Sequence, residues 1–100
     1  MTRTLTVSRV RVRAGQEGEY LAAVRELAAL HVARGRRLWL FRRAGRAGEF
    51  LECSESGDEA THRAVAVPPE DERRIEARIR AVAEYDSGAW DLWEEVRSEG

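Results

Sequence analysis

The sequence predicts a two-layer α+β domain, in which a four-stranded antiparallel sheet is covered by two helices on one face. Three observations predict it. Residues 36–55 form two apolar runs around a link with two glycines, as in a β-hairpin. Residues 16–34 and 69–84 carry apolar side chains at helical spacing. With one strand before the first helix and another after the second, the order is β-α-β-β-α-β, which is the ferredoxin-like arrangement.

Length and composition set the limits of this interpretation. The chain of 100 residues makes one domain, 1–100, and its net charge of −1 shows no overall bias towards nucleic acid. Cys53 is the only cysteine, so no internal disulfide forms, and the pattern is typical of the reducing cytoplasm. No apolar stretch has the length of a signal peptide core or a membrane span. We therefore expect a cytoplasmic protein with no membrane partner.

The first strand is predicted over Leu5–Arg13. Leu5 and Val7 share one face of this strand, whereas Val10 and Val12 share the other, because side chains alternate along a strand. This change of phase has two explanations. Either a bulge interrupts the strand, or its two ends are buried on different faces.

The first helix is predicted over Gln16–Arg34. Its apolar stripe steps by four, three and four residues through Tyr20, Val24, Leu27 and His31. Gly35 follows as the C-terminal cap, because glycine adopts the left-handed conformation that ends many helices.

The hairpin over Arg36–Glu55 has a first strand that is apolar on both faces. Leu38 and Leu40 point one way, and Trp39 and Phe41 point the other. Helices on one side of the sheet cover only one of these pairs, so the other pair needs a partner. A second copy of the chain, packed sheet against sheet, supplies it and predicts a homodimer. Which pair meets the partner stays open at this point.

The second half of the chain is harder to assign. A short helix over 59–64 is one interpretation of residues 56–67, and Pro68-Pro69 ends that segment. Pro69 and three acidic residues then start a helix over Pro69–Glu84, followed by a turn over 85–88. Residues 89–97 fit a strand or a helix, and their tryptophans favour the strand.

The run Ser8-Arg9-Val10-Arg11-Val12-Arg13-Ala14-Gly15-Gln16-Glu17-Gly18-Glu19-Tyr20 resembles the opening of dimeric α+β barrel proteins. That superfamily contains the antibiotic-biosynthesis-monooxygenase and NIPSNAP-like domains, and the order of elements extends the resemblance over nearly the whole chain. It implies a homodimer with a ligand cleft between each sheet and its own helices. The monooxygenase and haem-degrading branches of that superfamily resemble one another in using an Asn, a Trp and a His or Arg around the cleft. This chain has no Asn, and Cys53-Ser54 stands where the tryptophan is expected. These departures argue against a haem-degrading enzyme.

Five residues are candidates for a site. His31 is either a half-buried structural histidine or a base lining the cleft, since its ordinary pKa suits proton transfer near neutral pH. His62 is either exposed or at the rim of the cleft. Tyr20, Trp39 and Phe41 are candidate ligand contacts, although aromatic side chains of this kind more often form a core or an interface.

Metal and cofactor binding are not expected. Cys53 and two histidines at irregular spacing do not make a metal site, and Cys53 is better explained as a small buried residue. No phosphate-binding loop, nucleophile elbow or paired-carboxylate motif is present.

The sequence thus predicts a homodimer that binds a small apolar or aromatic organic molecule between the sheet and the helices. The alternative is a cofactor-independent monooxygenase-like or isomerase-like enzyme with His31 as the base.

Overall fold

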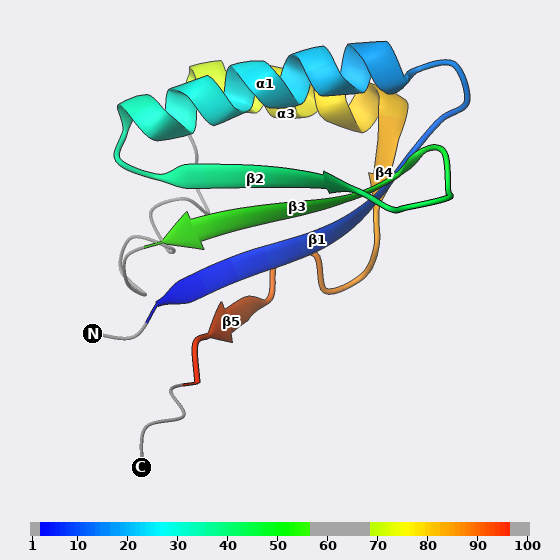
Figure 1. The fold of residues 1–100 in the computed structure, drawn as a ribbon. Helices are drawn as coiled ribbons and strands as arrows, with labels where there is room; N and C mark the ends of the chain where they lie inside the picture. Colours follow the sequence, from blue (N-terminus) through cyan, green and yellow to red (C-terminus); the bar gives the residue numbers. More distant parts are fainter. Residues whose placement is uncertain (1–2, 57–68, 97–100) are drawn as a thin grey trace.

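The computed structural model describes residues 3–56 and 69–96 (Figure 1). The elements are β1 (Thr4–Val12), α1 (Glu17–Ala33), β2 (Arg37–Arg42), β3 (Glu49–Ser56), α3 (Glu70–Val82), β4 (Ala83–Tyr85) and β5 (Leu92–Glu94). The strands form one antiparallel sheet of order β2-β3-β1-β4, and β5 pairs with the other end of β1. The predicted α+β class and the antiparallel sheet under two helices are confirmed, with five strands instead of four.

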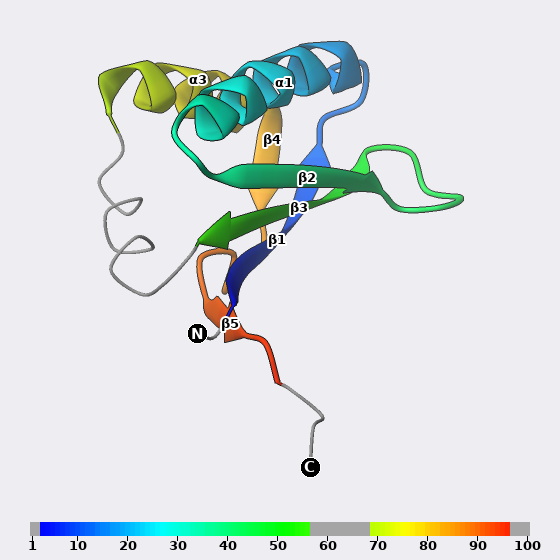
Figure 2. The same ribbon diagram turned by 60° about the vertical axis from the view of Figure 1, so that its left-hand side comes forward.

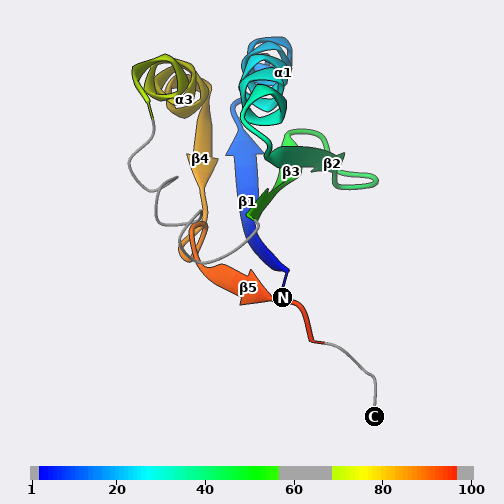
Figure 3. The same ribbon diagram turned by 90° about the vertical axis from the view of Figure 1, so that its left-hand side faces the viewer.

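The two helices lie side by side on one face of the sheet, which we call the inner face (Figure 3). Helix α1 runs back over β2, β3 and β1, while α3 leads into β4 (Figure 2). The core between the two layers contains Val10, Val12, Tyr20, Ala23, Val24, Leu27, Phe50, Ile75, Ile79 and Ala83. The opposite face, which we call the outer face, carries no helix of the described chain (Figure 3).

Strand β1 alternates regularly between the two faces. Its pairing with β3 runs without a break from Thr4 opposite Ser56 to Arg11 opposite Glu49, so the described strand contains no bulge. Val10 and Val12 are buried on the inner face, whereas Leu5 and Val7 lie half-buried on the outer face. Neither explanation of the phase change holds, because the inner face of the strand is buried along its whole length. The phase changes because the buried inner residues are polar at Thr4, Thr6 and Ser8 and apolar at Val10 and Val12.

The hairpin places its two apolar pairs on opposite faces, as its alternation predicts. Leu38 and Leu40 pack against the core beneath the helices. Trp39 and Phe41 point to the outer face, where the side chain of Phe41 is 54% exposed. The aromatic pair is thus the one that faces away from α1.

The end of the chain departs from prediction at two points. Helix α3 stops at Val82 rather than Glu84, because Ala83 turns to an extended conformation and starts β4 against β1. Tyr85, assigned to a turn from the sequence, belongs to this strand, and the turn begins at Asp86. The strand expected within 89–97 is confirmed, but only over Leu92–Glu94. The short helix considered for 59–64 lies outside the described residues, as does His62.

No helix among the described residues is long and apolar enough to cross a membrane.

Candidate functional site

The inner face of the sheet is divided into an apolar half and a polar half. Val10, Val12 and Phe50 form the apolar half within the core. The polar half consists of Thr4, Thr6 and Ser8 on β1 and Glu52 on β3, with 5%, 8%, 2% and 6% of their surfaces exposed. Ser8 stands opposite Glu52 in the strand register, and its hydroxyl donates to the Ala89 carbonyl. The sheet thus buries a patch of hydroxyls and a carboxylate where an ordinary core has apolar side chains.

Glu52 is held by two tyrosines from different elements. The Tyr20 hydroxyl, on α1, donates to Glu52 Oε2 at 2.5 Å, and the Tyr85 hydroxyl, on β4, lies 2.9 Å from both carboxylate oxygens. Among the described residues, Glu52 forms no ion pair. Burial raises the pKa of Glu52 above its usual range, although the two tyrosine hydrogen bonds act in the opposite direction. Burial, followed by the neighbouring Glu52 charge, raises the pKa of both tyrosines.

A second polar cluster joins the end of α1 to the start of α3. The Arg36 N–H donates to the His31 carbonyl at 2.8 Å and the Gly35 N–H to the Val32 carbonyl at 3.1 Å, which is a Schellman cap with Gly35 at a φ of +73°. This cap places the side chains of Arg36 and His31 beside each other. The glycine cap predicted from the sequence is thus present, and it shapes the cluster.

Glu72, in the first turn of α3, is the centre of this cluster. Its carboxylate, 2% exposed, lies 3.4 Å from His31 Nε2 and 2.8 Å from Arg36 Nη2, and it also accepts from Arg34. Burial and the Arg36 charge lower the pKa of His31, although Glu72 acts in the opposite direction. His31 is therefore a neutral imidazole near pH 7.

The two clusters lie at opposite ends of α1. Tyr20 and His31 are eleven residues apart, which corresponds to about 16 Å along a helix. The last turn of α1, with His31, lies over the end of the sheet where β2 begins and β3 ends (Figure 1). Between the clusters, the buried residues of α1 are the apolar Ala23, Val24 and Leu27. The arrangement offers an apolar wall with a polar cluster at each end.

The residues proposed from the sequence do not form one site. Tyr20 and His31 face the interior, whereas Trp39 and Phe41 lie across the sheet on the outer face. Cys53 stands between Val7 and Trp39 in the strand register, also on the outer face, and burial raises the pKa of its thiol.

Sequence reasoning missed Glu52, Tyr85 and Glu72, and it did not place Arg36 beside Glu72. Glu52 had a signal, because the alternation that points Phe50 inward points Glu52 inward as well. Glu72 is one of three acids in the first turn of α3, where the helix dipole alone explains acidic residues. Tyr85 and Arg36 owe their positions to β4 and to the helix cap.

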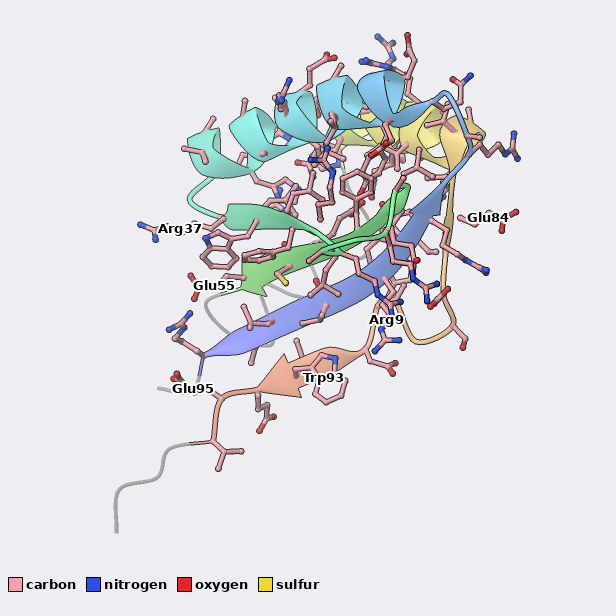
Figure 4. All side chains as sticks on the ribbon, turned by 45° about the vertical axis from the view of Figure 1, so that its right-hand side comes forward. Arg9, Arg37, Glu55, Glu84, Trp93 and Glu95 are labelled. Atoms are coloured by element: carbon pink, nitrogen blue, oxygen red, sulfur yellow. The ribbon has the colours of Figure 1, made fainter. Side chains whose placement is uncertain are left out.

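The outer face has two open grooves, of about 690 and 790 Å³. Both are lined by Arg9, Arg11 and Leu51, and the larger also by Trp93. Arg9 and Trp93 lie on the side of the sheet away from the helices (Figure 4). His31 lines neither groove. Over residues 3–56 and 69–96, no group of three or more His, Cys, Asp or Glu side chains is placed to hold a metal ion.

Comparison with known proteins identifies the fold. No family model matches the chain, and no curated protein matches its sequence. Among solved structures, SnoaB, a cofactor-independent oxygenase from Streptomyces nogalater, is 16% identical with a TM-score of 0.74, covering 99% of this chain and 95% of that one. A candidate antibiotic biosynthesis monooxygenase from Caulobacter crescentus is 13% identical with a TM-score of 0.77, covering 96% and 91%.

A conserved protein of unknown function from Bacteroides thetaiotaomicron is 19% identical with a TM-score of 0.73, covering 94% of this chain and 95% of that one. At these identities the likeness shows the fold alone. The chain therefore has the fold of antibiotic-biosynthesis-monooxygenase-like proteins, which confirms at the level of fold the resemblance inferred from its sequence.

Proposed function

We propose that this protein is a homodimer that binds a small organic molecule, with an apolar or aromatic body, at the polar half of its inner face. The observation that carries the proposal is the burial of Thr4, Thr6, Ser8 and Glu52 together on one face of the sheet. Hydroxyls and a carboxylate are uncommon in a purely structural core, and here the Ala89 carbonyl holds Ser8 while Tyr20 and Tyr85 hold Glu52 in fixed positions. Ligand sites, by contrast, combine apolar walls with a few placed polar groups.

The two ends of α1 supply that combination. The Tyr20–Glu52–Tyr85 hydrogen bonds fix one polar end, and the His31–Glu72 cluster fixes the other. Val24 and Leu27 are buried apolar residues of α1 between them. A ligand with an apolar body and a polar group matches this order of side chains.

A thermal-shift and ligand-observed NMR screen of small aromatic compounds tests the binding proposal. Thr6→Phe fills the polar half, so we expect it to abolish binding of compounds that bind the wild type. Thr6→Val keeps the shape and removes the hydroxyl, and we expect weaker binding. The matched control is Arg25→Phe, which adds the same ring at an exposed position of α1. Equal binding by the wild type and Thr6→Phe would contradict the proposal.

The dimer rests on the outer face. An apolar surface covers the middle of that face and consists of Leu5, Val7, Trp39, Phe41, Leu51, Cys53 and Trp93. Phe41 and Trp93 are 54% and 58% exposed, and contiguous apolar patches of this kind mark interaction surfaces. A second copy related by a twofold axis offers the same surface in return, and the two sheets then pack face to face.

Light scattering after size exclusion tests this assembly. We expect a dimer for the wild type and a monomer for Phe41→Arg, because the substitution buries an unpaired charge in the interface. Val32→Arg is the matched control, since Val32 is also an exposed apolar residue, at 67%, and lies on α1 away from the outer face. A monomeric wild type would remove this part of the proposal.

The enzyme alternative, with His31 as base, has weaker support. His31 is 5% exposed, its Nε2 faces the Glu72 carboxylate, and it lines neither described groove. SnoaB is a cofactor-independent oxygenase, but at 16% identity its activity does not transfer to this chain.

A further inference from the structure

Two buried nitrogen atoms of the His31–Glu72 cluster have no hydrogen-bond partner among the residues that the structure describes. These are His31 Nδ1 and Arg36 Nη1. Their side chains are only 7% and 10% exposed. Buried polar groups in native structures almost always have partners, so two such atoms in one cluster require an explanation.

The chemistry of each atom follows from its neighbours. A carboxylate only accepts hydrogen bonds, so the His31 Nε2 that faces Glu72 Oε1 carries the proton. In the neutral ring Nδ1 is then a bare acceptor. Arg36 uses Nη2 for Glu72 Oε2, which leaves the two N–H groups of Nη1 as donors. The cluster thus offers one acceptor and a pair of donors.

The charges of the cluster favour a neutral group over an anion. Arg36 is matched by Glu72, and Arg34 is matched by Asp71 at 2.6 Å. The Arg36 charge also acts on Glu76, a third carboxylate of α3. Among the described residues of the cluster, no positive charge remains to be neutralised, so a second anion gains little here.

We infer that His31 and Arg36 form a subsite for a neutral ligand group that both donates and accepts hydrogen bonds, such as a carboxamide or a hydroxyl. The donor of the ligand bonds to His31 Nδ1, and its acceptor bonds to Arg36 Nη1. The inference rests on the proposed function and adds the class of polar group that the ligand carries. The lowered pKa of His31 agrees with it, because protonated imidazole has no acceptor.

Four small probes of similar size test the subsite on the full chain: benzamide, phenol, benzoate and toluene. We expect dissociation constants for benzamide and phenol to be at least about tenfold lower than for toluene and benzoate, since each satisfied buried hydrogen bond adds to affinity. Arg36→Lys keeps a cation for Glu72 but removes the Nη1 donors. We therefore expect it to bind benzamide no better than toluene. Arg74→Lys is the matched control, since Arg74 forms an exposed ion pair on α3.

Each possible result supports or overturns the subsite. Binding of all four probes with equal affinity would overturn the inference and leave the proposed function standing. A crystal structure in which benzamide binds elsewhere, with only an ordered water between His31 and Arg36, would do the same. If none of the four probes binds, both the subsite and the proposed function are overturned. The comparison among the four probes uses the wild-type protein, so it tests the subsite even if Arg36→Lys fails to fold.

Discussion

Replacing Glu72 by glutamine removes the charge at the centre of the His31–Glu72 cluster without changing its shape. The carboxylate is 2% exposed and contacts two arginines, of which Arg36 is itself 10% exposed. Removing one partner of a buried ion pair costs about 3–5 kcal/mol, because the other charge is left uncompensated. The glutamine oxygen still accepts from Arg36, so we expect a loss of about 2–3 kcal/mol of unfolding free energy. For a chain of 100 residues this lowers Tm by roughly 10–20 °C.

The matched control lies in the same helical turn. Glu70 pairs with Arg74 at 3.2 Å, with side chains 69% and 78% exposed. Exposed pairs contribute little, so Glu70→Gln should cost no more than about 0.5 kcal/mol. Both residues lie in the first turn of α3, so loss of the favourable interaction with the helix dipole is common to both variants. The difference in unfolding free energy between the two variants therefore measures the effect of burying the charged pair.

Urea and thermal unfolding, followed by circular dichroism, measure the difference. All three proteins are compared at pH 7 and at one protein concentration, because association of subunits also stabilises the folded state. Equal destabilisation by Glu72→Gln and Glu70→Gln would refute the claim that the buried cluster ties α1 to α3.

Three further predictions use the same assays. Burial raises the folded-state pKa of Glu52 above its usual 4.5. The stability that this group contributes is therefore present below pH 4.5 and is lost as pH rises through the folded-state pKa. Glu52→Gln should gain stability relative to the wild type as pH rises above 4.5, and a difference that does not change with pH would contradict this. Tyr20→Phe and Tyr85→Phe should each cost about 1–3 kcal/mol at pH 7, because each leaves the buried carboxylate with one donor fewer, and a loss below the error of the urea titration would argue against it. Gly48→Ala should lower Tm more than Gly45→Ala. Both glycines have a φ near +78°, but only a Cβ at Gly48 meets the Val12 carbonyl oxygen, at 3.0 Å. Equal Tm values for the two variants would contradict this.

Much of the fold follows from patterns within short segments. The period of α1, the glycine cap after it and the alternation of the hairpin are local signals, and each leads to the observed element. Strand β4 is not local. Ala83-Glu84 continues the helical pattern of α3, and only pairing with the free edge of β1 makes it, with Tyr85, a strand. Local patterns within one segment do not show that a helix end competes with pairing to a distant strand.

The site was less accessible from the sequence, for a related reason. His31 and Tyr20 stand out as polar atoms on an apolar stripe, and both do face the interior. Their partners Glu72 and Glu52 come from distant segments, and a single sequence does not reveal which carboxylate meets which helix. Trp39 and Phe41 were grouped with them because they are aromatic, yet strand alternation places them on the opposite face.

A titration of the ¹⁵N-labelled protein with benzamide, followed by backbone amide chemical shifts, tests whether a small organic ligand binds between the helices and the inner face of the sheet. We expect the largest shift changes between the helices and the inner face, from His31 and Arg36 to Thr6, Ser8 and Glu52 on the polar half. Changes confined to Phe41 and Leu51 on the outer face, or no change at saturating benzamide, would contradict it.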